Sequence, residues 1–181
     1  SFRQTALWRK TPGRCPGPRS ILKKPKSGPG LWPALDAGWG SVLCGGMTIL
    51  NILEFPDPRL RRIALPVAEV TAEIRSLAAD MLETMYAAPG RGLAGPQVGA
   101  LLRIFVMDVT WKDGTPEPFV CINPEITGFS EETASFTEGC LSIPDVPGEV
   151  VRPAEIDLSW TDLSGTRRHR RMSGMEAVCA Q

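Results

Sequence analysis

The chain has 181 residues, of which 43% are apolar and 22% are charged, a balance typical of one globular domain. Its apolar runs are all shorter than the ~18 residues of a membrane-spanning helix, so the sequence predicts no membrane segment and no membrane partner. The five cysteines form no C-x-x-C pair, which argues against a zinc ribbon and against a disulfide framework. The formal net charge is zero, but residues 47–181 hold 12 basic and 19 acidic residues, which argues against nucleic-acid binding by the folded part.

Residues 1–46 differ in character from the rest of the chain. They hold eight Lys or Arg and one acidic residue, Asp36, are dense in Pro and Gly, and show no apolar periodicity. Such a segment buries too little apolar surface to offset the entropy cost of ordering, so we expect a disordered basic leader before a domain at residues 47–181. Three interpretations of the leader stay open: an upstream extension with Met47 as the natural start, an organellar transit peptide, and an arm that binds nucleic acid or membranes.

The domain contains four regions with clear secondary-structure patterns. Residues 71–88 carry apolar side chains at helical spacing and are followed by a Pro-Gly pair, so they predict an amphipathic helix. Residues 101–109 and 119–124 are rich in β-branched and aromatic side chains and predict strands. Residues 155–162 alternate in polarity, reach a Leu-Ser-Gly turn and continue into residues 166–172, which predicts a β-hairpin.

The last nine residues, SGMEAVCAQ, predict the start of a helix. Ser173 and Glu176 have the spacing of a capping box, in which each side chain accepts a hydrogen bond from a free backbone N–H at the helix start. Met175, Val178 and Cys179 then fall on one face of the helix. One long helix, several short antiparallel strands and this final helix together predict an α+β domain.

A glycine-rich segment, PGRGLAGPQVG, connects the predicted long helix to the first predicted strand. Glycine allows a close backbone approach, so a peptide could lie against this segment at Gly92. Gln97 carries a neutral amide that is suited to polarising a carbonyl group. The alternative is a plain turn between helix and strand. A phosphate-binding loop is excluded, because G-x-x-x-x-G-K-[ST] does not occur.

A second segment, TEGCLSIPDVPG, places Cys140 in a predicted loop. An isolated cysteine is most often a small buried apolar residue, and this stays open beside the roles of metal ligand and nucleophile. A cysteine nucleophile needs a basic histidine as its partner. The only histidine, His169, lies among four arginines that disfavour its cationic form, so we expect it at a solvated strand edge.

GLAGPQVG and EGCLSIP, in this order and about 40 residues apart, resemble the first two motifs of the peptide deformylase family. These metalloenzymes remove the formyl group from the N-terminal methionine of nascent proteins. The resemblance runs from Met47 to Gln181 and implies an α+β fold in which short antiparallel strands pack around a C-terminal helix. The usual first motif has alanine where this chain has Gly95, and we expect this change to loosen the packing beside Gln97.

The resemblance also implies roles for five residues. Cys140 matches a metal ligand, while the Gln97 side chain and the Leu141 backbone N–H match donors to the oxyanion that forms on the formyl group. Gly92 and Gly139 match positions at which the family's loops lie close to the bound peptide. The implied cofactor is Fe(II) or another divalent metal such as Zn, Ni or Co.

The family's third motif, His-Glu-x-x-His on a C-terminal helix, supplies two further metal ligands and the general acid/base. This motif does not occur here, and the closing Ala-Val-Cys-Ala-Gln resembles the residues that lead into it. The sequence therefore predicts a deformylase domain that is truncated at its C-terminus. We expect the 181-residue chain not to hold the metal and to be inactive.

For the complete enzyme, the resemblance implies N-formylmethionyl nascent peptides near the ribosome as partners. It implies the bacterial cytoplasm as the location, or an organelle if the basic leader is a transit peptide. Two other hypotheses stay open. One is a non-catalytic deformylase-like protein that binds formyl-Met or Met peptides, and the other is a hydrolase with Cys140 as its nucleophile.

Overall fold

The computed structural model describes residues 48–181. The predicted leader, residues 1–46, lies outside the described residues. No helix in the described part of the chain is both long enough and apolar enough to cross a membrane.

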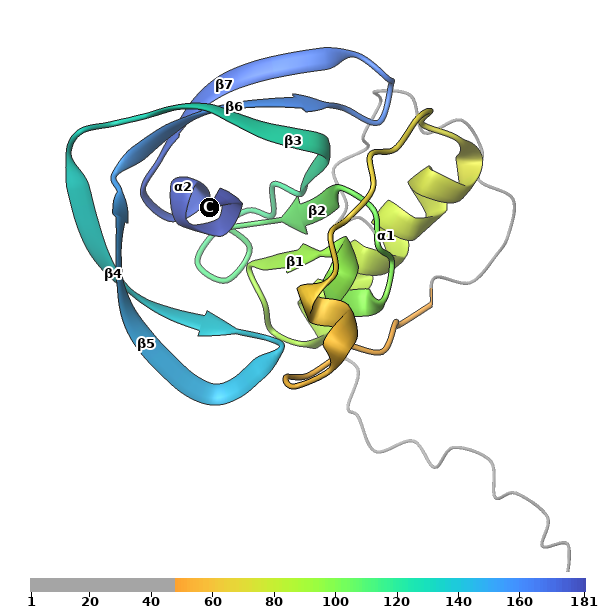
Figure 1. Cartoon of the computed structure of the whole chain (residues 1–181), viewed down its shortest axis with the longest axis horizontal. Coiled ribbons are helices and arrows are strands. Elements are labelled where there is room, and N and C mark those ends of the chain that lie inside the picture. Colours follow the sequence, from red (N-terminus) through yellow and green to blue (C-terminus); the bar gives the residue numbers. More distant parts are fainter. Residues whose placement is uncertain (1–47) are drawn as a thin grey trace, which may run out of the picture. The chain divides into compact units, whose positions relative to one another are not determined.

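The described residues form two α-helices, two short 3₁₀ helices and seven strands, coloured along the chain in Figure 1. The helices are η1 (Pro58–Arg61), α1 (Ala72–Ala87), η2 (Gly95–Val98) and α2 (Gly174–Ala180). The strands are β1 (Gly92–Ala94), β2 (Ile104–Met107), β3 (Phe119–Phe129), β4 (Thr133–Cys140), β5 (Ile143–Pro153), β6 (Glu155–Thr161) and β7 (Arg167–Ser173).

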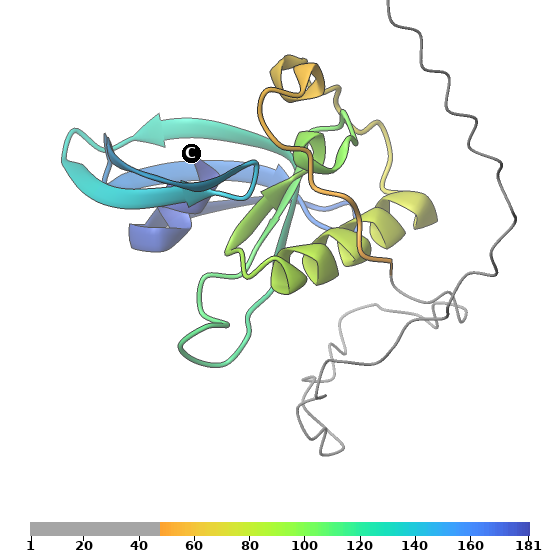
Figure 2. The ribbon, with the colours of Figure 1, turned by 90° about the horizontal axis from the view of Figure 1, so that it is seen from below.

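The strands form two antiparallel sheets. Five strands pair in the order β1-β2-β3-β6-β7, and β4 pairs with β5 in a separate two-stranded sheet. Helix α1 lies along β1 and β2, whereas α2 lies against the curved strands at the other end (Figures 1 and 2). This arrangement confirms the predicted α+β class, with antiparallel strands around a C-terminal helix.

Helix α1 is the element that the sequence predicted best. Ala78, Met81 and Met85 have no exposed surface, and they join residues of β1 and β2 in one apolar cluster. A second cluster lies between α2 and strands β2, β3, β6 and β7. The two helices therefore cover different parts of the five-stranded sheet, and the candidate site lies between them.

Strands β6 and β7 form the predicted hairpin. Its turn is closed by the Asp162 carboxylate, which accepts hydrogen bonds from the backbone N–H groups of Ser164 and Thr166, and Gly165 adopts φ +84°. Strand β7 is an edge strand, and its exposed His169 lies opposite Ser159, as predicted. The four neighbouring arginines are all paired with carboxylates: Arg167 with Glu125, Arg168 with Asp162, Arg170 with Glu176, and Arg171 with Glu155.

Helix α2 begins after Ser173, as predicted, but the predicted capping box is wrong. The Ser173 side chain makes no capping hydrogen bond, and Glu176 accepts instead from the Arg170 guanidinium at 2.8 Å. The charge of Arg170, on the neighbouring strand, outcompetes the neutral backbone N–H for the carboxylate. Ala177 is the buried residue of this helix. Of the predicted apolar face, Cys179 packs against the second cluster, whereas Met175 is exposed.

Strands β4 and β5 were not predicted, and the segment TEGCLSIPDVPG is not the loop that we expected. Cys140 ends β4, residues 141–142 form the turn, and β5 begins at Ile143. Most of β5 is exposed and it contains Pro144 and Pro147, so it lacks the alternating pattern of a half-buried strand. A two-stranded sheet has only edge strands, which tolerate proline.

Candidate active site

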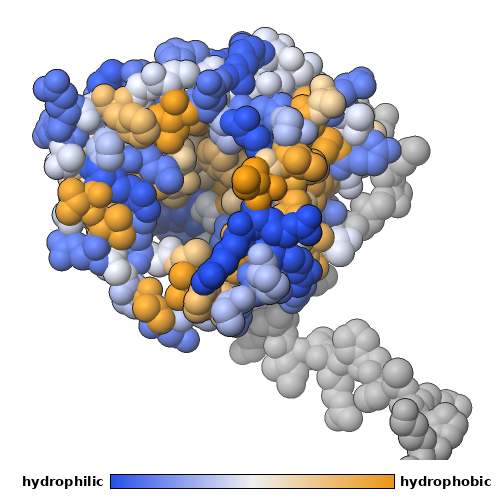
Figure 3. All heavy atoms as spheres, viewed as in Figure 1, coloured by the Kyte–Doolittle hydropathy of each residue, from blue (hydrophilic) through white to orange (hydrophobic). Residues whose placement is uncertain are grey.

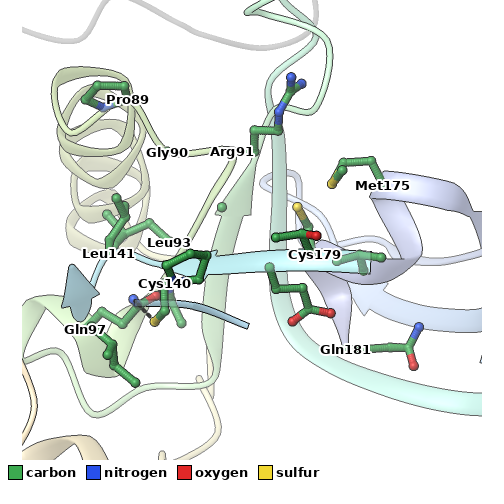
Figure 4. Close-up of a pocket in the computed structure, with 18 of the residues that line it drawn as sticks. Pro89, Gly90, Arg91, Leu93, Gln97, Cys140, Leu141, Met175, Cys179 and Gln181 are labelled. Atoms are coloured by element: carbon green, nitrogen blue, oxygen red, sulfur yellow. Dashed lines mark hydrogen bonds between the residues drawn. The ribbon is translucent and has the colours of Figure 1, made fainter. Parts of the chain in front are cut away.

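A cavity of about 990 Å³ lies between the glycine-rich segment, the β4–β5 turn and α2. The space-filling view shows this part of the molecule hollowed, with apolar side chains on the rim (Figure 3). Gln97 and Cys140 lie together at one end of the pocket (Figure 4). Met175 and Cys179 of α2, and Gln181 directly after it, line the pocket from the other side. The predicted apolar face of α2 therefore lines this pocket.

The Gln97 side chain is held in one orientation. Its Oε1 accepts a hydrogen bond from the Ala94 backbone N–H at 2.8 Å, and its Nε2 donates to Ser142 Oγ at 3.1 Å. Nε2 also lies 3.8 Å from Cys140 Sγ. The amide oxygen of Gln97 is thus bonded to the backbone, and its NH₂ group faces the Cys140 thiol.

The two motifs are joined through a third segment of backbone. The Leu53 N–H donates to the Gln97 carbonyl at 2.7 Å, and the Phe55 N–H donates to the Ser142 carbonyl at 2.8 Å. Ser142 is only 4% exposed, so these bonds lie in a protected environment. Residues that are far apart in the sequence therefore hold Gln97 and Cys140 side by side.

The packing at Gly95 is tight, and the predicted loosening is wrong. A Cβ atom at this position would lie 2.7 Å from the Ala100 carbonyl oxygen and 2.9 Å from a methyl group of Ile104. Both distances are shorter than real Cβ contacts. The backbone carbonyls of Ala100 and Leu102, which follow η2, and the Ile104 side chain of β2 fill the space that an alanine side chain would occupy.

Cys140 is exposed, so the interpretation as a buried apolar residue is wrong. Among the three cysteines that the structure describes, Cys121 is buried, and burial raises the pKa of its thiol. Burial also raises the pKa of the Cys179 thiol, to about 11. Cys140 is therefore the most accessible of these thiols. His169 lies on the exposed edge strand β7 and does not line the pocket, so it forms no pair with Cys140 there.

Leu141 packs its side chain against the glycine-rich segment. A Cβ at Gly90 would lie 2.7 Å from Leu141 Cδ1, so a side chain at position 90 would have to displace the end of the Leu141 side chain. The two glycines with predicted roles in peptide binding, Gly92 and Gly139, are less closely packed than Gly90. A Cβ at Gly92 would make only ordinary contacts of 3.7 to 3.8 Å, to the Val106 carbonyl and to Cys179, and one at Gly139 would meet nothing within 4 Å. Their predicted contacts with a peptide remain predictions.

Glu138 and Arg152 form an ion pair at the pocket that sequence reasoning missed. The carboxylate accepts from Arg152 Nε at 2.6 Å and from Nη2 at 2.8 Å. The hydrogen bond from Arg152 lowers the pKa of the Glu138 carboxyl below its ordinary value of 4.5. The pair links β4 to β5 two residues before Cys140. No local signal could have found it, because it depends on the register of two strands that the sequence did not predict.

Replacing Glu138 with glutamine is expected to lower the free energy of unfolding by about 1 kcal/mol at pH 7. Because the pKa of Glu138 is depressed in the folded state, the pair stabilises the fold above pH 4.5, and this contribution is lost as the pH falls through the folded-state pKa. Urea unfolding at pH 7, 5 and 3 measures the difference. Glu149→Gln, on the same hairpin, is the control, since within residues 48–181 Glu149 accepts a hydrogen bond from the Ser135 hydroxyl and forms no ion pair. A loss for Glu138→Gln that is equally large at pH 3 contradicts the prediction.

The match to the family model described as polypeptide deformylase covers residues 49–181. A peptide deformylase of Acinetobacter baumannii (strain SDF) is 50% identical over 135 residues, which cover 75% of this chain and 76% of that protein. The chain belongs to the peptide deformylase family. A peptide deformylase of Afipia carboxidovorans is 48% identical over 135 residues, covering 75% of this chain and 79% of that protein.

Solved structures of peptide deformylases share this fold. A plant peptide deformylase superposes with a TM-score of 0.70 at 33% identity, covering 73% of this chain and 72% of that chain. The peptide deformylase of Synechococcus elongatus in complex with actinonin gives 0.69 at 37% identity, covering 72% and 71% of the two chains. The predicted family, a family of hydrolases, is thereby confirmed.

The peptide deformylase family implies a divalent metal, but the side chains in the described part of the chain do not fit one. Residues 48–181 contain no group of three or more His, Cys, Asp or Glu side chains that could hold an ion. The nearby Glu138 is already engaged by Arg152. Cys140 alone cannot replace a three-ligand site, because affinity depends on several ligands held in a fixed geometry.

Proposed function

We propose that this peptide deformylase domain belongs to an enzyme that hydrolyses the formyl group from N-terminal formylmethionine. The observation that carries the proposal is the Gln97 amide, which is held with its donor side beside Cys140 at one end of the 990 Å³ pocket. Attack of water on a formyl carbon places negative charge on the carbonyl oxygen, and a fixed neutral donor stabilises that charge.

Five residues have named roles in this proposal. The Gln97 Nε2 and the Leu141 backbone N–H donate to the oxygen that becomes negative, and Gly92 and Gly139 leave room for the backbone of the peptide. Cys140 is one ligand of the proposed cofactor, Fe(II) or another divalent ion such as Zn, Ni or Co. Residues 48–181 do not supply the remaining ligands, and we propose that the 181-residue chain by itself is inactive.

The proposed substrates are the N-formylmethionyl ends of nascent peptides near the ribosome, in the bacterial cytoplasm or, if the leader is a transit peptide, in an organelle. The acidic balance of residues 47–181 and the pairing of every arginine on β7 argue against nucleic acid as a ligand of the folded domain.

Formate release from formyl-Met-Ala-Ser tests the proposal. The 181-residue chain with added Fe(II) or Ni(II) is expected to release no more formate than the metal alone. The same chain extended beyond Gln181 by a family segment with His-Glu-x-x-His is expected to turn over, because it then has three ligands and a general base. Turnover by the 181-residue chain contradicts its proposed inactivity, and an inactive, folded and metal-loaded extended chain contradicts deformylation.

A second candidate function is favoured by the incomplete set of metal-binding side chains. A chain that keeps the pocket and Gln97 but holds no metal could bind formyl-Met or Met peptides without cleaving them. Calorimetric titration of the 181-residue chain with formyl-Met-Ala-Ser distinguishes this candidate. Saturable binding without formate release supports it, whereas an affinity that rises only with added metal does not.

A further inference from the structure

Asp108 is a buried carboxylate to which the proposed reaction gives no role. Its side chain follows β2 and the residue is 1% exposed. It forms no ion pair within residues 48–181, and its oxygens are satisfied by neutral donors. Oδ2 accepts from the Tyr86 hydroxyl at 2.7 Å, and Oδ1 accepts from the backbone N–H groups of Thr110 at 3.1 Å and Trp111 at 3.0 Å. A buried carboxylate with several fixed donors holds those donors in one arrangement.

The two backbone donors belong to a short segment, residues 108–112, which we call the strap, and the third donor, Tyr86, lies on α1. The Asp108 carboxylate turns the backbone of the strap, so that the Trp111 indole packs edge-on against the Tyr86 ring, with the ring centroids 5.2 Å apart. Trp111 Nε1 then donates to the Gly90 carbonyl at 2.8 Å. The Asp108 carboxylate thus holds Trp111 in the position from which its indole binds the Gly90 carbonyl.

The strap holds one wall of the pocket, residues 89–92. Three consecutive carbonyl groups of this wall each accept a hydrogen bond from the strap: Pro89 from the Lys112 ammonium at 2.5 Å, Gly90 from the Trp111 indole at 2.8 Å, and Arg91 from the Asp108 backbone N–H at 2.9 Å. The Arg91 guanidinium points away from Gln97 and Cys140 in Figure 4, and it binds the Val109 carbonyl and the Asp113 carboxylate. The wall is therefore bound to the strap at three consecutive residues.

We propose that Asp108 is a positioning residue, which through the strap holds the pocket wall in the shape that accepts a formylmethionyl peptide. The identity of the ligand rests on the proposed function, whereas the ordering of the wall does not. The wall contains Gly90 and Gly92, whose backbone is intrinsically free, so its shape must come from contacts outside it. Asp108 orders the strap that makes those contacts.

Two substitutions at position 108 distinguish the effect of the hydrogen bonds of Asp108 from the effect of its negative charge. Asn in place of Asp keeps an oxygen for the N–H groups of Thr110 and Trp111, and its amide can donate to the Tyr86 oxygen. Alanine removes these three interactions and also the hydrogen bond from the Thr110 hydroxyl to Oδ1 at 3.2 Å. Thr84→Ala is the matched control, since Thr84 is a buried polar residue whose hydrogen bonds go to Leu50 and Asp80 and not to the strap.

The test measures two quantities on the ¹⁵N-labelled 181-residue chain. These are the hydrogen-exchange rate of the Trp111 indole N–H and the Kd for formyl-Met-Ala-Ser by NMR titration. Asp108→Ala is expected to raise the exchange rate at least tenfold and to weaken binding at least tenfold. Asp108→Asn is expected to stay within about threefold of the unmodified chain in both, and Thr84→Ala within about twofold.

Equal effects of Asp108→Ala and Thr84→Ala, or no effect of Asp108→Ala on either quantity, overturn the proposal. If the unmodified chain binds no formyl-Met-Ala-Ser, the second candidate function, peptide binding by this chain alone, fails. The exchange rates then still decide whether Asp108 orders the wall, and formate release by the extended chain still decides whether the domain deformylates. If Asp108→Ala does not fold, Trp111→Phe removes the bond to Gly90 and keeps an aromatic ring beside Tyr86. It is then expected to weaken binding by about threefold or more and to speed exchange of the Gly92 amide, and unchanged values overturn the proposal.

Discussion

Replacing Gln97 with alanine, in the chain extended by a His-Glu-x-x-His segment, is expected to lower kcat/KM for formyl-Met-Ala-Ser by about 100- to 1000-fold. The reason is the loss of the Nε2 donor, since removal of one oxyanion donor costs roughly 2.7–4 kcal/mol of transition-state stabilisation. Steady-state formate release measures the effect. A loss smaller than tenfold in a correctly folded variant contradicts the assigned role.

Two further variants separate donation from orientation. Gln97→Glu keeps an oxygen that can accept from the Ala94 N–H but loses the donor, so its loss of kcat/KM is expected to match that of Gln97→Ala. Ser142→Ala leaves the donor in place and removes only one of its partners, so a loss below about tenfold is expected. Ser142→Ala as severe as Gln97→Ala would show that orientation of the amide, and not donation, carries the effect.

Replacing Met81 with alanine is expected to lower the free energy of unfolding by about 2–5 kcal/mol. Met81 has no exposed surface, and its removal leaves a cavity between α1 and the sheet that the surrounding backbone cannot fill. Urea unfolding monitored by circular dichroism at pH 7 measures the loss. Met175→Ala is the matched control, because Met175 is 41% exposed, and its effect is expected to stay within about 0.5 kcal/mol. Similar losses for both variants contradict the prediction.

The elements that local patterns could predict were predicted well. Residues 71–88 gave a helix whose observed bounds are Ala72–Ala87, because its buried side chains recur at the helical period. The hairpin at residues 155–172 was predicted because its turn chemistry lies within a few residues. Strands β4 and β5 were not predicted, because most of β5 is exposed and contains proline. In addition, no local pattern in the sequence indicates that β5 pairs with β4.

The candidate site shows the same division. Gln97 and Cys140 were identified from their motifs, but they are 43 residues apart, and their contact depends on how the chain folds. The Glu138–Arg152 pair and the strap around Asp108 were not found from the sequence. Each consists of polar residues with no distinctive spacing, and each acquires its role only when two segments are brought together.

By itself, the sequence determined the family, the α+β class, the long helix and the two residues at the centre of the site. Periodicity, turn chemistry and short motifs involve residues that are close together in the sequence, so they can be recognised from the sequence alone. Only the tertiary structure decided that the Gln97 amide presents its donor to Cys140, that the apolar face of α2 lines the pocket, and that Gly95 is closely packed. These features depend on strand register and on the close approach of segments that are distant in the sequence. Once polar groups are buried, each donor or acceptor has few other partners, so its hydrogen bond is fixed.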